Sequence, residues 1–158
     1  MTEPNDLSHR FEADSVGRAL SLVGERWTLL ILCEAFFGVR RYGQFARNLK
    51  IPRPTLSSRL RTLVEAGLLE RVAYAHGPDR YEYRLTDAGR DLFGAIVALM
   101  RWGDAHMAGP EGPPIVLRHN VCGEIADPRL TCHHCGEEID VRNVTPEPGP
   151  GFRERARL

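Results

Sequence analysis

The sequence predicts a mostly helical α+β fold that carries one small antiparallel hairpin. Three observations predict it: apolar residues recur at helical spacing before residue 67, two strand-like segments flank a turn between residues 69 and 85, and a long helical pattern follows. Hydrophobic residues make up 42% of the 158, as in proteins with a buried core. This length suits one domain of ordinary size with a small appendage.

The first two predicted helices follow a flexible N-terminal arm over residues 1–14. Ser15 is a suitable N-cap for the first of them, in which apolar residues recur at i, i+3, i+4 and i+7 until Gly24 interrupts the pattern. Residues 25–37 form the second helix. Because this segment is apolar nearly all round, we expect it at the centre of the core.

The next two predicted helices are joined by a turn at residues 51–53. A short helix over about residues 42–48 precedes the turn. Pro52 disfavours helix at the residue before it, whereas Pro54 suits the first turn of the helix that follows. That helix ends at Gly67, a suitable C-cap, and it places leucines on one face and polar or Arg side chains on the other.

A β-hairpin follows these four helices. Residues 69–74 and 81–85 are strand-like, and the second segment alternates cleanly. Residues 76–79 between them, His-Gly-Pro-Asp, have the composition of a turn.

A long helix completes the predicted domain, capped by Thr86 or Asp87 and ending near Met107. Its middle, residues 95–100, is apolar on every side. Because one domain core covers only one face of a helix, this segment predicts a surface for a partner chain as well.

This order of elements is that of a winged helix-turn-helix, in which one helix enters the major groove of DNA. Base edges there are read by polar and Arg side chains near the N-terminus of that helix. The short preceding helix offers Arg side chains to phosphates, and the hairpin forms the wing. The candidate DNA-binding residues are Arg40, Arg41, Arg47, Arg53, Thr55, Ser57, Ser58, Arg59, Arg61, His76 and Arg80.

Charge is distributed unevenly along the chain, although the net charge is zero. From Arg40 to Arg84 there are ten Lys or Arg and four Asp or Glu, whereas residues 85–148 hold five basic and ten acidic residues. A basic middle suits a polyanion such as DNA, but a solvated charged surface would give the same pattern.

Four sequence segments within about residues 15–105 resemble the HxlR-type family of winged-helix regulators. They are Val23-Gly24-Glu25-Arg26-Trp27-Thr28-Leu29-Leu30-Ile31-Leu32, Arg41-Tyr42-Gly43-Gln44-Phe45, Leu56-Ser57-Ser58-Arg59-Leu60 and Tyr81-Glu82-Tyr83-Arg84-Leu85-Thr86-Asp87-Ala88-Gly89. The resemblance implies a homodimer that binds near-palindromic operators, with the N-terminal and long C-terminal helices in the interface. Together with the apolar helix, it predicts interface residues Leu92, Phe93, Ile96, Leu99, Met100 and Trp102.

Several members of that family sense oxidants or electrophiles through a cysteine just before the first helix. The corresponding run here is Asp14-Ser15-Val16, so that thiol is absent. Cys33 lies in the helix that is apolar on all sides, and we expect a buried, inert thiol.

The other three cysteines crowd into a short C-terminal segment. His119, Cys122, Cys132 and Cys135 form two pairs, each with two residues between its members and each ending in Cys-Gly. This spacing is typical of a zinc ribbon and predicts a structural zinc ion. His133 or His134 could replace His119 as the fourth ligand. A metal-free hairpin with reduced cysteines, or a Cys132–Cys135 pair that cycles with redox state, are the alternatives.

The predicted organisation is an arm (1–14), a DNA-binding and dimerisation domain (15–107), a linker (108–114), a small zinc-ribbon-like unit (115–145) and a disordered tail (146–158). We expect a cytoplasmic transcriptional regulator, a repressor with no membrane segment and no enzymatic activity. Its operator, target genes and any small-molecule or redox effector are open. A thiol-dependent redox protein and a zinc-stapled protein-interaction module are the competing interpretations.

Overall fold

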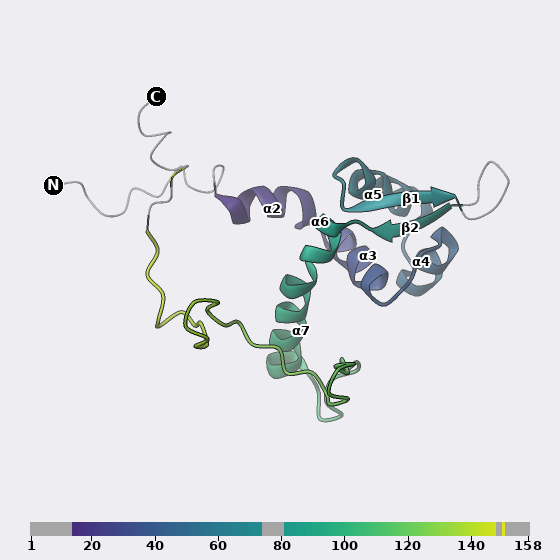
Figure 1. Cartoon of the computed structure of the whole chain (residues 1–158). Coiled ribbons are helices and arrows are strands. Elements are labelled where there is room, and N and C mark those ends of the chain that lie inside the picture. The colour runs from purple at the N-terminus through teal and green to yellow at the C-terminus, as the bar shows by residue number, and fades with distance from the viewer. Residues whose placement is uncertain (1–13, 74–80, 148–149, 151–158) are drawn as a thin grey trace. The chain divides into compact units, whose positions relative to one another are not determined.

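The computed structural model describes residues 14–73, 81–147 and 150, and the chain divides into two compact units, Met1–Met107 and Ala108–Leu158. The helices and strands whose bounds can be described lie in the first unit (Figure 1). In chain order they are α2 (Ser15–Val23), α3 (Arg26–Phe36), α4 (Tyr42–Leu49), α5 (Arg53–Glu65), β1 (Leu69–Ala73), β2 (Tyr81–Leu85), α6 (Asp87–Asp91) and α7 (Phe93–Met107).

Acidic side chains cap the first two helices. The N-cap of α2 is Asp14 rather than Ser15, because the Asp14 carboxylate accepts a hydrogen bond from the backbone N–H of Val16 at 3.4 Å. Glu25 caps α3 by accepting from the backbone N–H groups of Trp27 and Thr28. The predicted helices are therefore present, with boundaries shifted by a residue.

Strands β1 and β2 form a two-stranded antiparallel sheet, as the alternation predicts. The register runs from Leu69 opposite Leu85 to Ala73 opposite Tyr81. The predicted turn at 76–79, and with it the candidate residues His76 and Arg80, lies outside the described residues.

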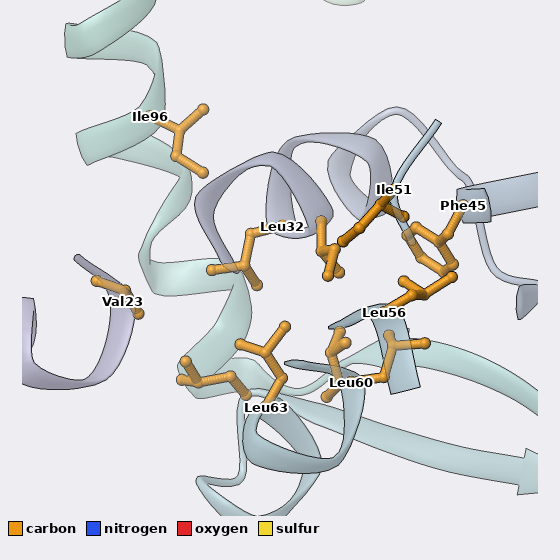
Figure 2. Packing of buried hydrophobic residues seen from close by; sticks show 11 residues of the cluster. Val23, Leu32, Phe45, Ile51, Leu56, Leu60, Leu63 and Ile96 are labelled. Carbon is orange, nitrogen blue, oxygen red and sulfur yellow. The ribbon is translucent and has the colours of Figure 1, made fainter. Parts of the chain in front are cut away.

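The core joins α3, α4, α5 and α7 around fully buried aliphatic and aromatic side chains (Figure 2). Phe45 from α4 and the three leucines 56, 60 and 63 of α5 are at most 1% exposed. Because these leucines occupy one helical face, the other face of α5 is left to solvent. The buried set is Val23, Ile31, Leu32, Phe45, Ile51, Leu56, Leu60, Leu63, Leu68, Leu69 and Ile96.

The prediction of one continuous helix after the hairpin is wrong, because the chain forms two helices separated at Leu92. Its backbone N–H bonds the Gly89 carbonyl three residues back, which closes α6 with a tight turn before α7 begins. Thr86 caps α6, and its hydroxyl accepts from the Gly89 N–H at 3.1 Å. A Cβ on Gly89 would overlap the Leu68 carbonyl oxygen, so only glycine permits this close approach of α6 to the β1 segment.

The second unit has little regular structure. Its described residues contain two isolated antiparallel bridges, Arg118 with Ile125 and Thr131 with Glu138. Within the described parts of the chain, no helix is both long enough and apolar enough to cross a membrane.

Candidate nucleic-acid interface

A three-residue turn joins α4 to α5 and fixes their mutual orientation. Lys50 ends α4 in the left-handed conformation, with φ of 51°, and Pro52 is the N-cap of α5. Ile51 between them is 5% exposed and belongs to the core, so the turn is anchored from inside. This helix-turn-helix matches the predicted one.

The solvent face of α5 carries the side chains that the sequence predicts for base recognition. Arg53, Ser57, Ser58 and Arg61 are exposed, whereas Thr55 and Arg59 are half-buried at the margins of this face. The first turn contains no acidic residue, so the positive end of the helix dipole is not offset there. A surface of this kind favours contact with a polyanion.

Tyr42 links α4 to the start of α5. Its hydroxyl donates to the backbone carbonyl oxygen of Arg53 or to Ser57 Oγ, each 3.0 Å away. These contacts hold two candidate residues of α5 in place relative to α4. The sequence analysis did not single out Tyr42, although a tyrosine at the first position of the supporting helix was a usable signal.

Arg59 occupies a different environment from the other candidate residues. Its Nε lies 3.5 Å from the Glu25 carboxylate, the same group that caps α3. The Arg59 side chain is 35% exposed. Arg59 therefore ties α5 to the start of α3 and presents only part of its guanidinium to solvent.

The predicted phosphate-contacting arginines lie on and before α4. Arg40, Arg41 and Arg47 are all exposed. Arg41 Nε lies 3.6 Å from Glu82 in β2, and Arg84 also pairs with that carboxylate at 3.1 Å. The hydrogen bond from Arg84 lowers the pKa of Glu82, so this carboxylate stays ionised beside the two arginines.

The wing is attached to the helix-turn-helix by a main-chain bond and an aromatic contact. The backbone N–H of Tyr83 in β2 donates to the Arg40 carbonyl at 2.7 Å. The Tyr83 ring packs edge-to-face on Phe45, with ring centroids 6.4 Å apart. Burial raises the pKa of the Tyr83 phenol, which remains neutral.

Arg71 on β1 is a further basic residue of the wing that the sequence analysis did not assign. Its guanidinium lies over the Tyr81 ring, 4.1 Å from the centroid, in a cation–π arrangement. Because this contact holds the side chain against the neighbouring strand β2, Arg71 is preorganised on the hairpin.

The predicted interface residues of α7 divide into two sets. Leu99 and Trp102 are 57% and 59% exposed, and Phe93 is 45% exposed while it packs against Phe36. Ile96 is instead 4% exposed in the chain's own core, and Leu92 and Met100 are partly buried against it.

Helix α2 also exposes apolar side chains, Val16 at 62% and Leu20 at 56%. Large exposed apolar side chains on two helices are typical of a surface that another chain covers.

Cys33 is half-buried in α3, and its thiol is free. Burial raises its pKa, and the neighbouring Glu34 charge adds to this effect. Both causes favour the unreactive protonated form.

The C-terminal candidate ligands are arranged in two pairs. His119 Nδ1 lies 3.3 Å from Cys122 Sγ. Hydrogen bonds to the Cys132 sulfur, chiefly from the backbone N–H groups of Cys135 and His134, lower the pKa of that thiol. Among the described residues, no three His, Cys, Asp or Glu side chains come close enough together to hold a metal ion. The structure thus brings His119 close to Cys122 and Cys132 close to Cys135, as two separate pairs.

Fold and surface together define a winged helix-turn-helix protein, and comparison with known proteins identifies its class. Residues 22–110 match the HxlR-like helix-turn-helix family, and the chain belongs to it. The family and its named relatives are transcription regulators. The protein is therefore a DNA-binding transcriptional regulator and not an enzyme.

The similarity to individual known proteins extends over both units of the chain. The chain is 75% identical, over 151 residues and 96% of each chain, to an uncharacterized HTH-type transcriptional regulator of Mycobacterium tuberculosis. It is similar to the crystal structure of a proposed transcription factor, PA1607, with a TM-score of 0.78 and 31% identity over 90% of this chain and 99% of that one. It is also similar to PA1374 of Pseudomonas aeruginosa, with a TM-score of 0.62 and 35% identity over 89% of this chain and 97% of that one.

Proposed function

We propose that the protein is a homodimeric, sequence-specific repressor that binds a near-palindromic operator. The observation that carries this proposal is the polar and basic solvent face of α5, held by Tyr42 on one side and by Glu25 on the other. A groove helix has to be exposed and rigidly placed before it can distinguish bases.

We assign two kinds of DNA contact, one to base edges and one to phosphates. Thr55, Ser57, Ser58 and Arg59 lie in its first two turns and are assigned to base edges, with Arg53 and Arg61 beside them. Arg40, Arg41 and Arg47 are assigned to phosphates, which position the helix without reading sequence. His76 and Arg80 of the wing are assigned to an adjacent groove or backbone from the sequence alone.

Arg41 has to exchange its ion pair with Glu82 for one with a phosphate. The pair is 3.6 Å long and the Arg41 side chain is 56% exposed, so this exchange costs little. Glu82 keeps Arg84 as a partner during the exchange. Glu82 therefore holds Arg41 beside the proposed DNA-binding surface and leaves it able to pair with a phosphate instead.

The dimer is assigned to the exposed apolar side chains of α7 and α2. Phe93, Leu99 and Trp102 form the α7 part, while Ile96 supports it from inside the core. Two copies of α5 related by a two-fold axis match two half-sites about one helical turn apart, which explains a near-palindromic operator. A dimer on such a site excludes other proteins from the same DNA, which favours repression.

In this proposal, residues 15–107 form the DNA-binding and dimerisation domain. Residues 108–114 then link it to the small unit at 115–145. Ala108 begins the second compact unit, in agreement with a boundary at this point.

Fluorescence anisotropy with DNA from upstream of the protein's own gene tests the proposal. We expect binding that resists excess unrelated duplex and weakens steeply with salt, since arginines release counterions from phosphates. Ser58→Ala should relax sequence preference with little change in the salt slope, whereas Arg47→Ala should reduce that slope by about one.

Binding no tighter than to unrelated DNA, over tiled fragments of the neighbouring genes, would contradict sequence-specific recognition. A monomer by light scattering at the concentrations that saturate DNA would contradict the homodimer. Arg142→Ala provides a matched control, because Arg142 lies in the second unit and pairs locally with Asp140.

A further inference from the structure

Two turns in the second unit repeat the same backbone structure, thirteen residues apart. In the first, the His119 N–H donates to the Glu124 carbonyl at 2.9 Å and the Gly123 N–H to the His119 carbonyl at 2.8 Å. In the second, the Cys132 N–H donates to the Glu137 carbonyl at 2.8 Å and the Gly136 N–H to the Cys132 carbonyl at 2.7 Å. The two segments are therefore one structural motif used twice.

Glycine is required at the same place in both turns. Gly123 and Gly136 each have φ of 77°, in the left-handed region that other residues rarely adopt. Each of them directly follows a cysteine, Cys122 or Cys135. The backbone thus reverses immediately after the last side chain of each candidate pair.

Each turn presents two donor atoms of the kinds that zinc prefers. In the first, His119 Nδ1 and Cys122 Sγ are 3.3 Å apart. In the second, backbone N–H groups of His134 and Cys135 point to Cys132 Sγ, and the Cys135 thiol also hydrogen-bonds to it. Imidazole nitrogen and cysteine sulfur are the usual ligands of structural zinc, and each turn places two of them side by side.

None of the described residues of the second unit belongs to a buried apolar core that could hold such turns together. Val121 and Val141 are 88% and 89% exposed, and Leu130 is 68% exposed. Units this small usually depend on disulfides or a metal for stability. All four cysteines of the chain are described and free, so no disulfide supplies that stability.

We infer that His119, Cys122, Cys132 and Cys135 of one chain bind a single structural zinc ion. Among the described residues each turn gathers only two donors, and zinc in a structural site takes four. The nine residues between Cys122 and Cys132 can span roughly 30 Å when extended, so one chain can bring both pairs to one ion. A site closed by four protein ligands has no open position for substrate, which agrees with a regulator that is not an enzyme.

Metal content and cobalt spectroscopy of the full-length protein test the inference. After purification without chelator and dialysis against metal-free buffer, we expect one zinc per chain. Replacement by Co²⁺ should give the intense visible bands of a tetrahedral site and a thiolate-to-cobalt band in the near ultraviolet. His119→Ala, Cys122→Ser, Cys132→Ser and Cys135→Ser should each lose the bound metal, whereas Cys33→Ser should keep it.

Three results would overturn the assignment. One is the absence of stoichiometric zinc together with no cobalt bands on titration of the reduced protein. Another is one zinc per two chains, which would place the site between copies. A third is metal retained by His119→Ala and lost by His133→Ala or His134→Ala, which would reject His119 as the fourth ligand.

Limited proteolysis tests the zinc site by a measurement that does not involve DNA binding. Zinc removal should increase tryptic cleavage after Arg118 and Arg129 while α3 to α5 stay folded by circular dichroism. Unchanged cleavage on chelation of the zinc-loaded protein would refute a stabilising role for the metal in this unit.

Discussion

Substitution of Arg59 by alanine separates the ion pair that this side chain makes in the structure from the DNA contact that we propose for it. Arg59 Nε lies 3.5 Å from the Glu25 carboxylate, and both side chains are more than a third exposed. Exposed and half-exposed ion pairs contribute about 0.2–1 kcal/mol. Because Glu25 still accepts the N–H groups of Trp27 and Thr28, the α3 cap remains. We therefore expect Arg59→Ala to lower the free energy of unfolding by about 1 kcal/mol and to stay folded.

The loss in DNA affinity should be larger than this loss in stability. A specific Arg contact contributes about 1–3 kcal/mol to binding, which corresponds to roughly a 5- to 150-fold rise in Kd. Urea unfolding followed by circular dichroism gives the first quantity, and fluorescence anisotropy on a mapped operator gives the second. Arg142→Ala in the second unit is the matched control and should change neither.

Glu25→Gln completes a double-mutant cycle, because glutamine keeps an acceptor for the cap and removes the charge. Its stability cost should shrink when Arg59 is already alanine, since the ion pair is then absent. Wild-type affinity in folded Arg59→Ala would refute a DNA contact by this residue. Unfolding of Arg59→Ala would refute the modest structural role calculated for it.

Three further predictions concern stability, thiol chemistry and assembly. Gly89→Ala should lower the free energy of unfolding in urea by about 1–3 kcal/mol, because its Cβ would overlap a main-chain carbonyl oxygen. Gly43→Ala has free space around its Cβ and should not lower it. Equal urea midpoints for the two variants would contradict this. Cys33 should resist iodoacetamide at neutral pH and react as pH rises toward its raised thiol pKa, measured by mass spectrometry; fast labelling in the native protein would contradict burial. Leu99→Glu should shift the proposed dimer toward monomer in light scattering, whereas Val144→Glu, a similarly exposed apolar site in the other unit, should not. An unchanged mass for Leu99→Glu would contradict an α7 interface.

The order of elements could be predicted because it depends on local signals. Gly24 and Gly67 punctuate the chain, Pro54 starts a helix, and apolar spacing marks the face of α5 that packs inward. These signals act within a few residues, so one sequence contains them in full. The break at Leu92 was missed because its backbone stays helical and the apolar pattern continues through it.

The partners of the candidate site residues could not be predicted in the same way. Tyr42 and Ser57 are fifteen residues apart, and Glu25 and Arg59 are still further apart, so their contacts depend on how helices pack. Ile96 likewise looks like any other apolar residue of its helix until the packing of α7 on α3 is known. Sequence periodicity shows which residues face outward, but it does not show which of them already contact a side chain of another helix.

The main-chain hydrogen bond from Tyr83 to the Arg40 carbonyl has a consequence for how such a regulator can change targets. It uses backbone atoms alone, so substitutions on the outer face of α5 leave it intact. The attachment of the wing to the helix-turn-helix is thereby separated from the identity of the bases that we propose α5 reads. New operators can be acquired by exchanging a few exposed side chains, while the spacing of contacts along the duplex is inherited unchanged.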